Sequence, residues 1–156
     1  MKVSEKTTFQ DYWNDERFEL KKPCRNGSQL KMLGDNIYHK NDKGEWIQED
    51  SHHSNQDGTT NNVNLSRDTG SCDHVLISDF FYYFGDKAIA VDLASLNYSS
   101  GLGYKKISLN KSPEGRTVIQ TIHSKNKNYL NFIVSNPCQF TDSHQRVDQG
   151  TSKIFE

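Results

Sequence analysis

The chain has 156 residues, of which 19 are basic and 20 acidic, and its formal net charge is -1. This length is that of one domain. The near-zero net charge argues against sequence-independent electrostatic binding of duplex nucleic acid, because such binding needs a concentrated basic face. Hydrophobic residues make up 33%, which indicates a small core, whereas 11% aromatic residues indicate a chain that folds rather than a disordered one.

The sequence lacks membrane and secretory signals. No stretch approaches the roughly 18 consecutive apolar residues of a membrane span, and the first residues lack the apolar run of a secretory signal. We therefore expect a cytoplasmic protein with no membrane partner. Cys24, Cys72 and Cys138 lie far apart without Cys-x-x-Cys spacing, so neither a disulfide framework nor a zinc knuckle is predicted.

The first predicted element is a helix over about Thr8–Asp15, with Thr8 as its N-cap. Phe9, Tyr12 and Trp13 follow at helical spacing and form one aromatic stripe. We interpret this stripe as a face that packs against the core rather than as a ligand cage.

The middle of the chain predicts extended structure. Residues 36–40 and 45–48 flank a polar turn and predict a β-hairpin. Residues 50–73 have almost no apolar content and predict a long polar loop. Residues 75–78 predict a buried strand, and the aromatic residues 80–85 predict a second extended segment; together they should form the centre of the sheet.

The last third of the chain predicts helices. Residues 93–96 favour one helical turn, and a helix begins after Ser112, its N-cap, with Pro113 at the first helical position. A second helix is predicted over roughly Lys125–Val134. Residues 141–156 are predicted to form a polar tail, so residues 1–140 are expected to be a single domain. The predicted fold class is α+β, with a small, curved, mostly antiparallel sheet of about five strands and flanking helices.

Few side chains outside the predicted core are suited to chemistry. The adjacent His52 and His53 point in different directions in a strand or a helix, so at most one of them would bind a given metal ion. We predict neither a metal site nor a cofactor. A Gly-x-Ser-x-Gly elbow and a Walker-A loop are both absent from the sequence.

Three stretches in this order and spacing resemble the nucleotide modification associated domain 2 family. They are Phe9–Phe18 leading into Lys21–Pro23, Leu33–His39 with Trp46, and Arg67-Asp68 followed by Val75–Gly85. Members of this family are associated with bacterial and phage gene clusters that modify nucleotides in DNA, and with base hypermodification, without an established reaction. The resemblance implies an association with nucleotide modification but no reaction mechanism.

Two departures from the family pattern are visible. The chain resembles a short form that lacks a preceding segment, and it has Gly101-Leu102-Gly103-Tyr104 where the family pattern has Gly-Arg-Gly-His. By analogy the family implies a barrel remnant like those of the PUA, ASCH and EVE type. A chain that starts within such a barrel leaves an open sheet edge, so we expect a homo-oligomer or a rearranged first strand.

The resemblance favours a nucleotide- or modified-base-binding protein of DNA-modification or defence-conflict systems. Single-stranded DNA and DNA with a flipped base are included among the expected partners. The expected ligand-binding residues are Asp35, Tyr38, His39, Trp46, Arg67, Asp68, Tyr82, Tyr83, Tyr104 and Lys105.

Two alternatives stay open. One is a phage anti-defence protein that sequesters or degrades a nucleotide-derived immune signal. The other is an enzyme of base hypermodification that uses acid-base chemistry, because a histidine titrates near neutral pH and a carboxylate can orient it. The candidate catalytic residues are His39, His52, Asp35 and Asp68.

Overall fold

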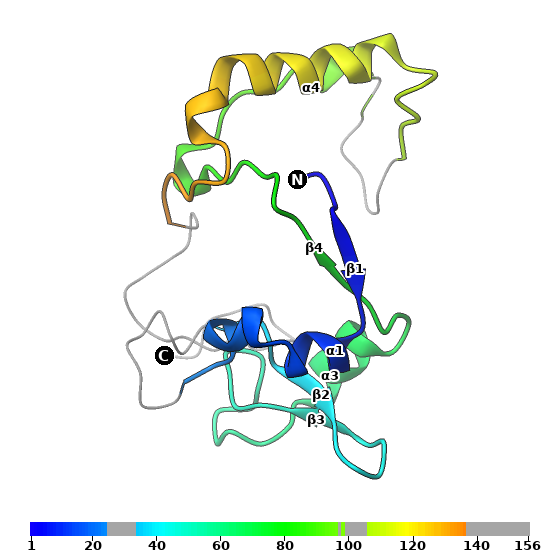
Figure 1. Ribbon diagram of the computed structural model, residues 1–156, viewed down its shortest axis with the longest axis vertical. Coiled ribbons are helices and arrows are strands. Elements are labelled where there is room, and N and C mark those ends of the chain that lie inside the picture. The colour runs from blue at the N-terminus through cyan, green and yellow to red at the C-terminus, as the bar shows by residue number, and fades with distance from the viewer. Residues whose placement is uncertain (25–33, 97, 99–105, 137–156) are drawn as a thin grey trace. The chain divides into compact units, whose positions relative to one another are not determined.

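The computed structural model describes residues 1–24, 34–96, 98 and 106–136 (Figure 1). They form two compact units, which we call the amino-terminal unit, Val3–Ser78, and the carboxy-terminal unit, Met1–Lys2 with the described residues from Asp79 on. The fold class is α+β as predicted, with helices and small antiparallel sheets that do not close. Within the described residues, no helix has the length and apolar character needed to cross a membrane.

The amino-terminal unit contains two separate antiparallel strand pairs, β1 with β4 and β2 with β3. Each strand is three residues long, and the described residues therefore do not form the predicted single sheet of about five strands. No strand pairing among the described residues joins the two pairs. In chain order the elements are β1 (Glu5–Thr7), α1 (Phe9–Asn14), the 3-10 helix η1 (Glu16–Lys21), β2 (Tyr38–Lys40), β3 (Trp46–Gln48), α3 (Asn62–Thr69) and β4 (Val75–Ile77).

The helix and the hairpin predicted for this unit are confirmed. The hydroxyl oxygen of Thr8 accepts a hydrogen bond from the backbone N–H of Asp11 at 3.0 Å, which caps α1. In the hairpin, Tyr38 lies opposite Gln48 and Lys40 lies opposite Trp46.

The prediction of a long loop over residues 50–73 is wrong in its second half, where α3 forms. The side chain of Asn61 caps this helix by accepting from the N–H of Asn64 at 3.0 Å. The helix escaped prediction because it buries polar residues, Asn64 and Thr69, and so lacks an apolar stripe.

The core of the amino-terminal unit is small and rich in polar side chains. Its buried apolar residues are Tyr12, Ile37 and Tyr38. Buried polar groups join the elements: the Asn36 side chain donates to the carbonyl of Tyr12 at 3.1 Å, and the Asn64 side chain donates to that of His53 at 2.7 Å. A polar core of this kind keeps its stability only while its hydrogen bonds are made.

The strand β4 is not the buried centre that residues 75–78 predicted. It pairs with β1, and the side chain of Leu76 is 52% exposed. The aromatic segment 80–85 lies in the carboxy-terminal unit, where its regular pairing is limited to single bridges, Lys2 with Phe80 and Tyr83 with Ile133.

The carboxy-terminal unit is built around one long helix, α4 (Pro113–Asn126), which begins as predicted with Ser112 as its N-cap. The predicted second helix over 125–134 is wrong. The chain turns at Asn131, whose φ is 61°, and then pairs with the aromatic segment. The shorter elements are the 3-10 helices η2 (Gly85–Lys87), η3 (Ala94–Leu96) and η4 (Lys127–Tyr129), and η3 confirms the predicted helical turn.

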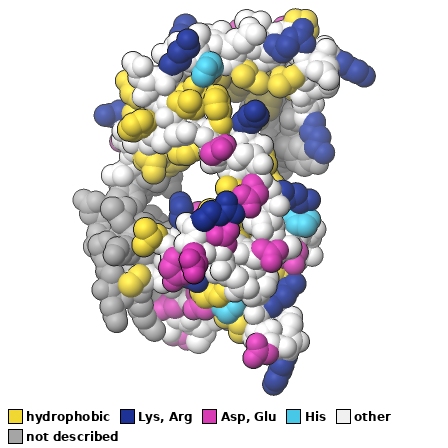
Figure 2. Space-filling view, viewed as in Figure 1, with side chains coloured by type: hydrophobic (Ala, Val, Ile, Leu, Met, Phe, Trp, Pro, Cys, Tyr) yellow, Lys and Arg dark blue, Asp and Glu magenta, His cyan; other side chains and the backbone are white. Residues whose placement is uncertain are grey.

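The two units differ in the burial of their apolar side chains. All apolar residues that count as buried among the described ones lie in the amino-terminal unit. The carboxy-terminal unit exposes large apolar side chains, among them Phe132 and Ile133, and Figure 2 shows hydrophobic side chains grouped on its visible face. The expectation of one domain over 1–140 stays a prediction, and the polar tail 141–156 lies outside the described residues.

Candidate functional site

A cavity of about 410 Å³ opens in the amino-terminal unit. Three aromatic residues, Phe9, Tyr12 and Phe18, line it together with the chain of β4 and its flanks. The carboxylate of Asp35 and the ammonium of Lys21 belong to its described lining, and so does the imidazole of His74. An apolar cavity with a few polar groups is the usual form of a small-molecule site.

Local sequence explains the aromatic wall. Because Thr8 starts α1, Phe9 and Tyr12 fall one turn apart and share a side of the helix. The ring of Phe18, from η1, packs on Tyr12 with centroids 4.4 Å apart. Arg17 holds this segment in place because it binds Glu5 and Asp15, each through nitrogen to oxygen distances of 2.9 Å or less.

A close backbone contact positions Asp35 beside the aromatic wall. The backbone N–H of Asn36 donates to the carbonyl of Lys21 at 3.0 Å. Gly34 lies so close to residues 21–23 that a Cβ atom on Gly34 would stand 2.6 Å from the backbone nitrogen of Pro23. The hydroxyl of Tyr12 then donates to Oδ1 of Asp35 at 3.1 Å. The hydroxyl of Tyr12 thus holds the Asp35 carboxylate in place in the cavity.

The state of Tyr12 follows from its surroundings. Burial raises the pKa of its hydroxyl, and the neighbouring negative charge of Asp35 raises it further. Tyr12 therefore stays neutral at ordinary pH and keeps donating its proton to the carboxylate.

A second polar cluster joins β2, the 51–54 turn and α3, and we call it the Tyr38 cluster. The hydroxyl of Tyr38 donates to Oδ2 of Asp68 at 2.7 Å, and Nδ1 of His53 lies 3.0 Å from the same oxygen. Gln48 donates to the Tyr38 hydroxyl at 3.3 Å, and the guanidinium of Arg67 donates to Oδ1 of Asp68 at 2.8 Å.

The hydrogen bonds of the Tyr38 cluster assign its protons. Burial acts to raise the pKa of Asp68, but hydrogen bonds from Arg67 and Tyr38 outweigh it and hold that pKa below its usual range. Asp68 is therefore an ionised acceptor, and the one proton of Tyr38 goes to it. With Asp68 as the acceptor, we assign Nδ1 of His53 as the donor in this contact, and Nε2 takes no part in it. An Asp–His pair of this kind is suited to general base chemistry.

The other candidates of this unit make separate contacts. The ring of His39 stacks on Trp13 with centroids 4.1 Å apart, and its Nε2 lies 2.8 Å from a carboxylate oxygen of Glu49. Trp46 packs edge-on against Phe9 and lies under the ammonium of Lys40, 4.5 Å from the ring centre. His52 contacts the ring of its neighbour in the Tyr38 cluster.

The remaining candidates divide between the carboxy-terminal unit and the undescribed residues. Tyr82 places its hydroxyl 2.6 Å from Nδ1 of His123, on α4. Tyr83 is 40% exposed. Tyr104 and Lys105, like the rest of the stretch Gly101–Tyr104, lie outside the described residues.

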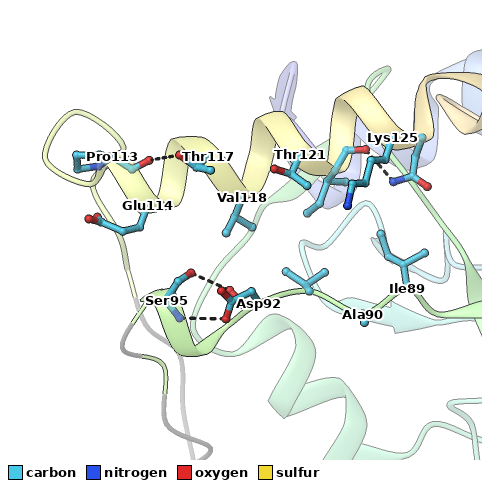
Figure 3. Close-up of a pocket in the computed structure, with 13 residues that line it drawn as sticks. Ile89, Ala90, Asp92, Ser95, Pro113, Glu114, Thr117, Val118, Thr121 and Lys125 are labelled. Atoms are coloured by element: carbon cyan, nitrogen blue, oxygen red, sulfur yellow. Dashed lines mark hydrogen bonds between the residues drawn. The ribbon is translucent and has the colours of Figure 1, made fainter.

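The carboxy-terminal unit has a cavity of its own, of about 490 Å³, between α4 and the segment 89–95. Figure 3 shows Lys125 reaching from the helix toward Ile89, and Val118 reaching toward Asp92. At the other end Asp92 is held by hydrogen bonds with Ser95. None of the described catalytic or ligand-binding candidates lines this cavity.

Sequence reasoning placed Asp35 in the candidate set but missed the residues around it. The stripe Phe9–Tyr12 was visible as helical spacing and was interpreted as core, which is correct for Tyr12. His53 and Gln48 were missed because nothing in the sequence pairs them with Asp68. Among the described residues, no group of three or more His, Cys, Asp or Glu side chains is placed to hold a metal ion.

The fold and the cavity define a small α+β domain with an aromatic, acid-bearing pocket. Residues 1–144 match the sequence model of the family described as nucleotide modification associated domain 2. The chain belongs to this family, which associates it with nucleotide modification and confirms the resemblance seen in the sequence. No curated protein and no solved structure matches the chain.

Proposed function

We propose that this protein binds a nucleotide or modified base in the cavity of the amino-terminal unit. The observation that carries the proposal is the cavity itself, because it combines aromatic walls with one carboxylate and one ammonium group. Its volume of about 410 Å³ falls within the roughly 300–1,000 Å³ of ligand pockets. Family membership supports a ligand of the nucleotide class.

Each part of the pocket suits one part of a nucleotide. Phe9 and Phe18 offer apolar ring surface, and stacking of a base on an aromatic side chain is worth about 1–3 kcal/mol. Asp35 accepts hydrogen bonds from base nitrogens, and the exposed ammonium of Lys21 suits a phosphate. Among the described residues, the other ligand-binding candidates, from Tyr38 to Tyr83, do not line this cavity.

Calorimetric titration of the full chain with the four ribonucleoside 5′-monophosphates tests this proposal. We expect at least one to bind, and Lys21→Ala to weaken the nucleotide more than the matching nucleoside, because only the nucleotide has a phosphate. Lys43→Ala, in the exposed hairpin turn, is the matched control and should change neither. If none of the four nucleotides binds, the proposal fails.

One observation favours a second function, an enzyme that acts on a nucleotide or base. The Asp68–His53 pair supplies an oriented basic nitrogen, although neither residue lines the cavity. Turnover of a nucleotide that stops in His53→Gln would support the enzyme. A bound nucleotide recovered unchanged would favour a binding protein, and sequestration of a nucleotide-derived immune signal in an anti-defence role would use the same pocket.

A further inference from the structure

We propose that the pocket selects guanine, with Asp35 accepting hydrogen bonds from N1–H and the 2-amino group of the base. This inference rests on the proposed function, since it names the base that the same cavity would take. It follows from the acceptors and donors that the pocket presents.

The carboxylate of Asp35 is available for a ligand. Its described hydrogen-bond partner is the hydroxyl of Tyr12, which occupies one position on Oδ1. No other described group is bonded to Asp35, so Oδ2 and the second position on Oδ1 can accept. An ionised carboxylate has two acceptor oxygens side by side and no donor.

The bases differ in what they can offer to two adjacent acceptors. Guanine presents two neighbouring donors, N1–H and the 2-amino group. Adenine and cytosine place a ring nitrogen acceptor beside their amino group, and uracil places a carbonyl on each side of its N–H. A carboxylate that meets one of these edges gains one hydrogen bond and places a second oxygen against an acceptor, which is repulsive. The pocket therefore rejects the other bases as well as attracting guanine.

The other side chains in the described lining that can hydrogen-bond are those of Tyr12, Lys21, His74 and Ser78, and none of them presents two adjacent acceptor oxygens. Asp35 is the one carboxylate among the described residues around the cavity. The Tyr12 hydroxyl fixes its orientation, and the contact of Gly34 and Asn36 with the chain at Lys21 fixes its backbone. A carboxylate that recognises the hydrogen-bonding edge of a base needs this fixed geometry, because a freely rotating one would discriminate much less between the bases.

Titration with GMP, IMP and AMP separates the possibilities. IMP is the analogue of GMP whose base lacks the 2-amino group, so it tests the hydrogen bond of that amino group in the unaltered protein. We expect GMP to bind about tenfold or more tighter than AMP, with IMP between them, since a good bidentate contact discriminates by about 1–3 kcal/mol. In Asp35→Asn the amide still accepts from Tyr12 but presents a donor to the base, so GMP binding should fall about tenfold or more.

The control and the contradicting results are distinct. Asp42→Asn removes the same charge from the exposed hairpin turn and should leave GMP binding unchanged. Equal affinity for GMP and AMP, or unchanged GMP binding in Asp35→Asn, would overturn guanine selection while leaving nucleotide binding intact. No binding of any nucleotide would overturn the proposed function itself.

Discussion

Tyr38 shows how one buried hydroxyl can join three elements at the scale of a residue. Its side chain is almost fully buried, and its oxygen contacts Asp68 on α3, Gln48 on β3 and His53 in the intervening turn. In a unit with so few buried apolar residues, these bonds replace part of the packing that a larger core would supply.

Replacing Tyr38 by phenylalanine should therefore destabilise the amino-terminal unit. The ring is kept, but the acceptor of Gln48 and the donor to Asp68 are lost, at a cost of about 1–3 kcal/mol. Urea unfolding followed by tryptophan fluorescence measures this directly, because both tryptophans, Trp13 and Trp46, lie in this unit. Tyr129→Phe, at an exposed position, is the control. An unchanged free energy of unfolding in Tyr38→Phe would show that the network contributes nothing.

The same tyrosines make stability depend on alkaline pH. Burial raises the pKa of Tyr12 and of Tyr38, and neighbouring carboxylates add to the shift. Their contribution is complete below the ordinary tyrosine pKa of about 10 and is lost as pH rises above it, because the unfolded chain then gives up protons that the folded chain holds. The free energy of unfolding should fall above about pH 10, and less steeply in Tyr38→Phe. Equal slopes in the two proteins would contradict this origin.

At the scale of elements, the contact between η1 and the chain before β2 fixes the pocket. Gly34 has an ordinary φ but no room for a Cβ, whereas Gly44 has open space but a φ of 79°. Gly34→Ala should cost about 3 kcal/mol or more, since backbone must move. Gly44→Ala should cost about 1–2 kcal/mol, the price of a left-handed backbone alone. Urea unfolding compares them, and a smaller loss in Gly34→Ala would show that the contact yields easily.

Elements with strong local signals could be predicted from the sequence, and those held by distant polar contacts could not. The caps Thr8 and Ser112 and the turn before Trp46 act within a few residues, so α1, α4 and the hairpin were found. The helix α3 depends on its buried Asn64, which bonds to a carbonyl eleven positions away, and no periodic pattern reveals that.

The same distinction between local signals and distant contacts holds for the candidate site. Asp35 and the aromatic stripe were visible separately, but their meeting depends on a backbone contact between Lys21 and Asn36, which a sequence does not display. The ligand-binding candidates include the pair Arg67 and Asp68 and the pair Tyr82 and Tyr83. The first pair lies in the amino-terminal unit and the second in the carboxy-terminal unit.

At the scale of the whole molecule, each unit has its own cavity, and we propose that the nucleotide binds in the amino-terminal one. The cavity beside α4 is larger, at about 490 Å³ against about 410 Å³. We favour the smaller because its described lining combines the rings of Phe9, Tyr12 and Phe18 with a carboxylate and an ammonium, whereas the described lining of the other has no aromatic ring. The expected homo-oligomer stays a prediction.

Nuclear magnetic resonance of the isotopically labelled chain tests this assignment most directly. On addition of GMP, backbone amide signals of α1, η1, Asp35 and β4 should shift in proportion to occupancy. Amides of α4 and of residues 89–95 should stay where they are. Shifts confined to α4 and its facing segment, or to the Tyr38 cluster, would place the ligand elsewhere and contradict the account.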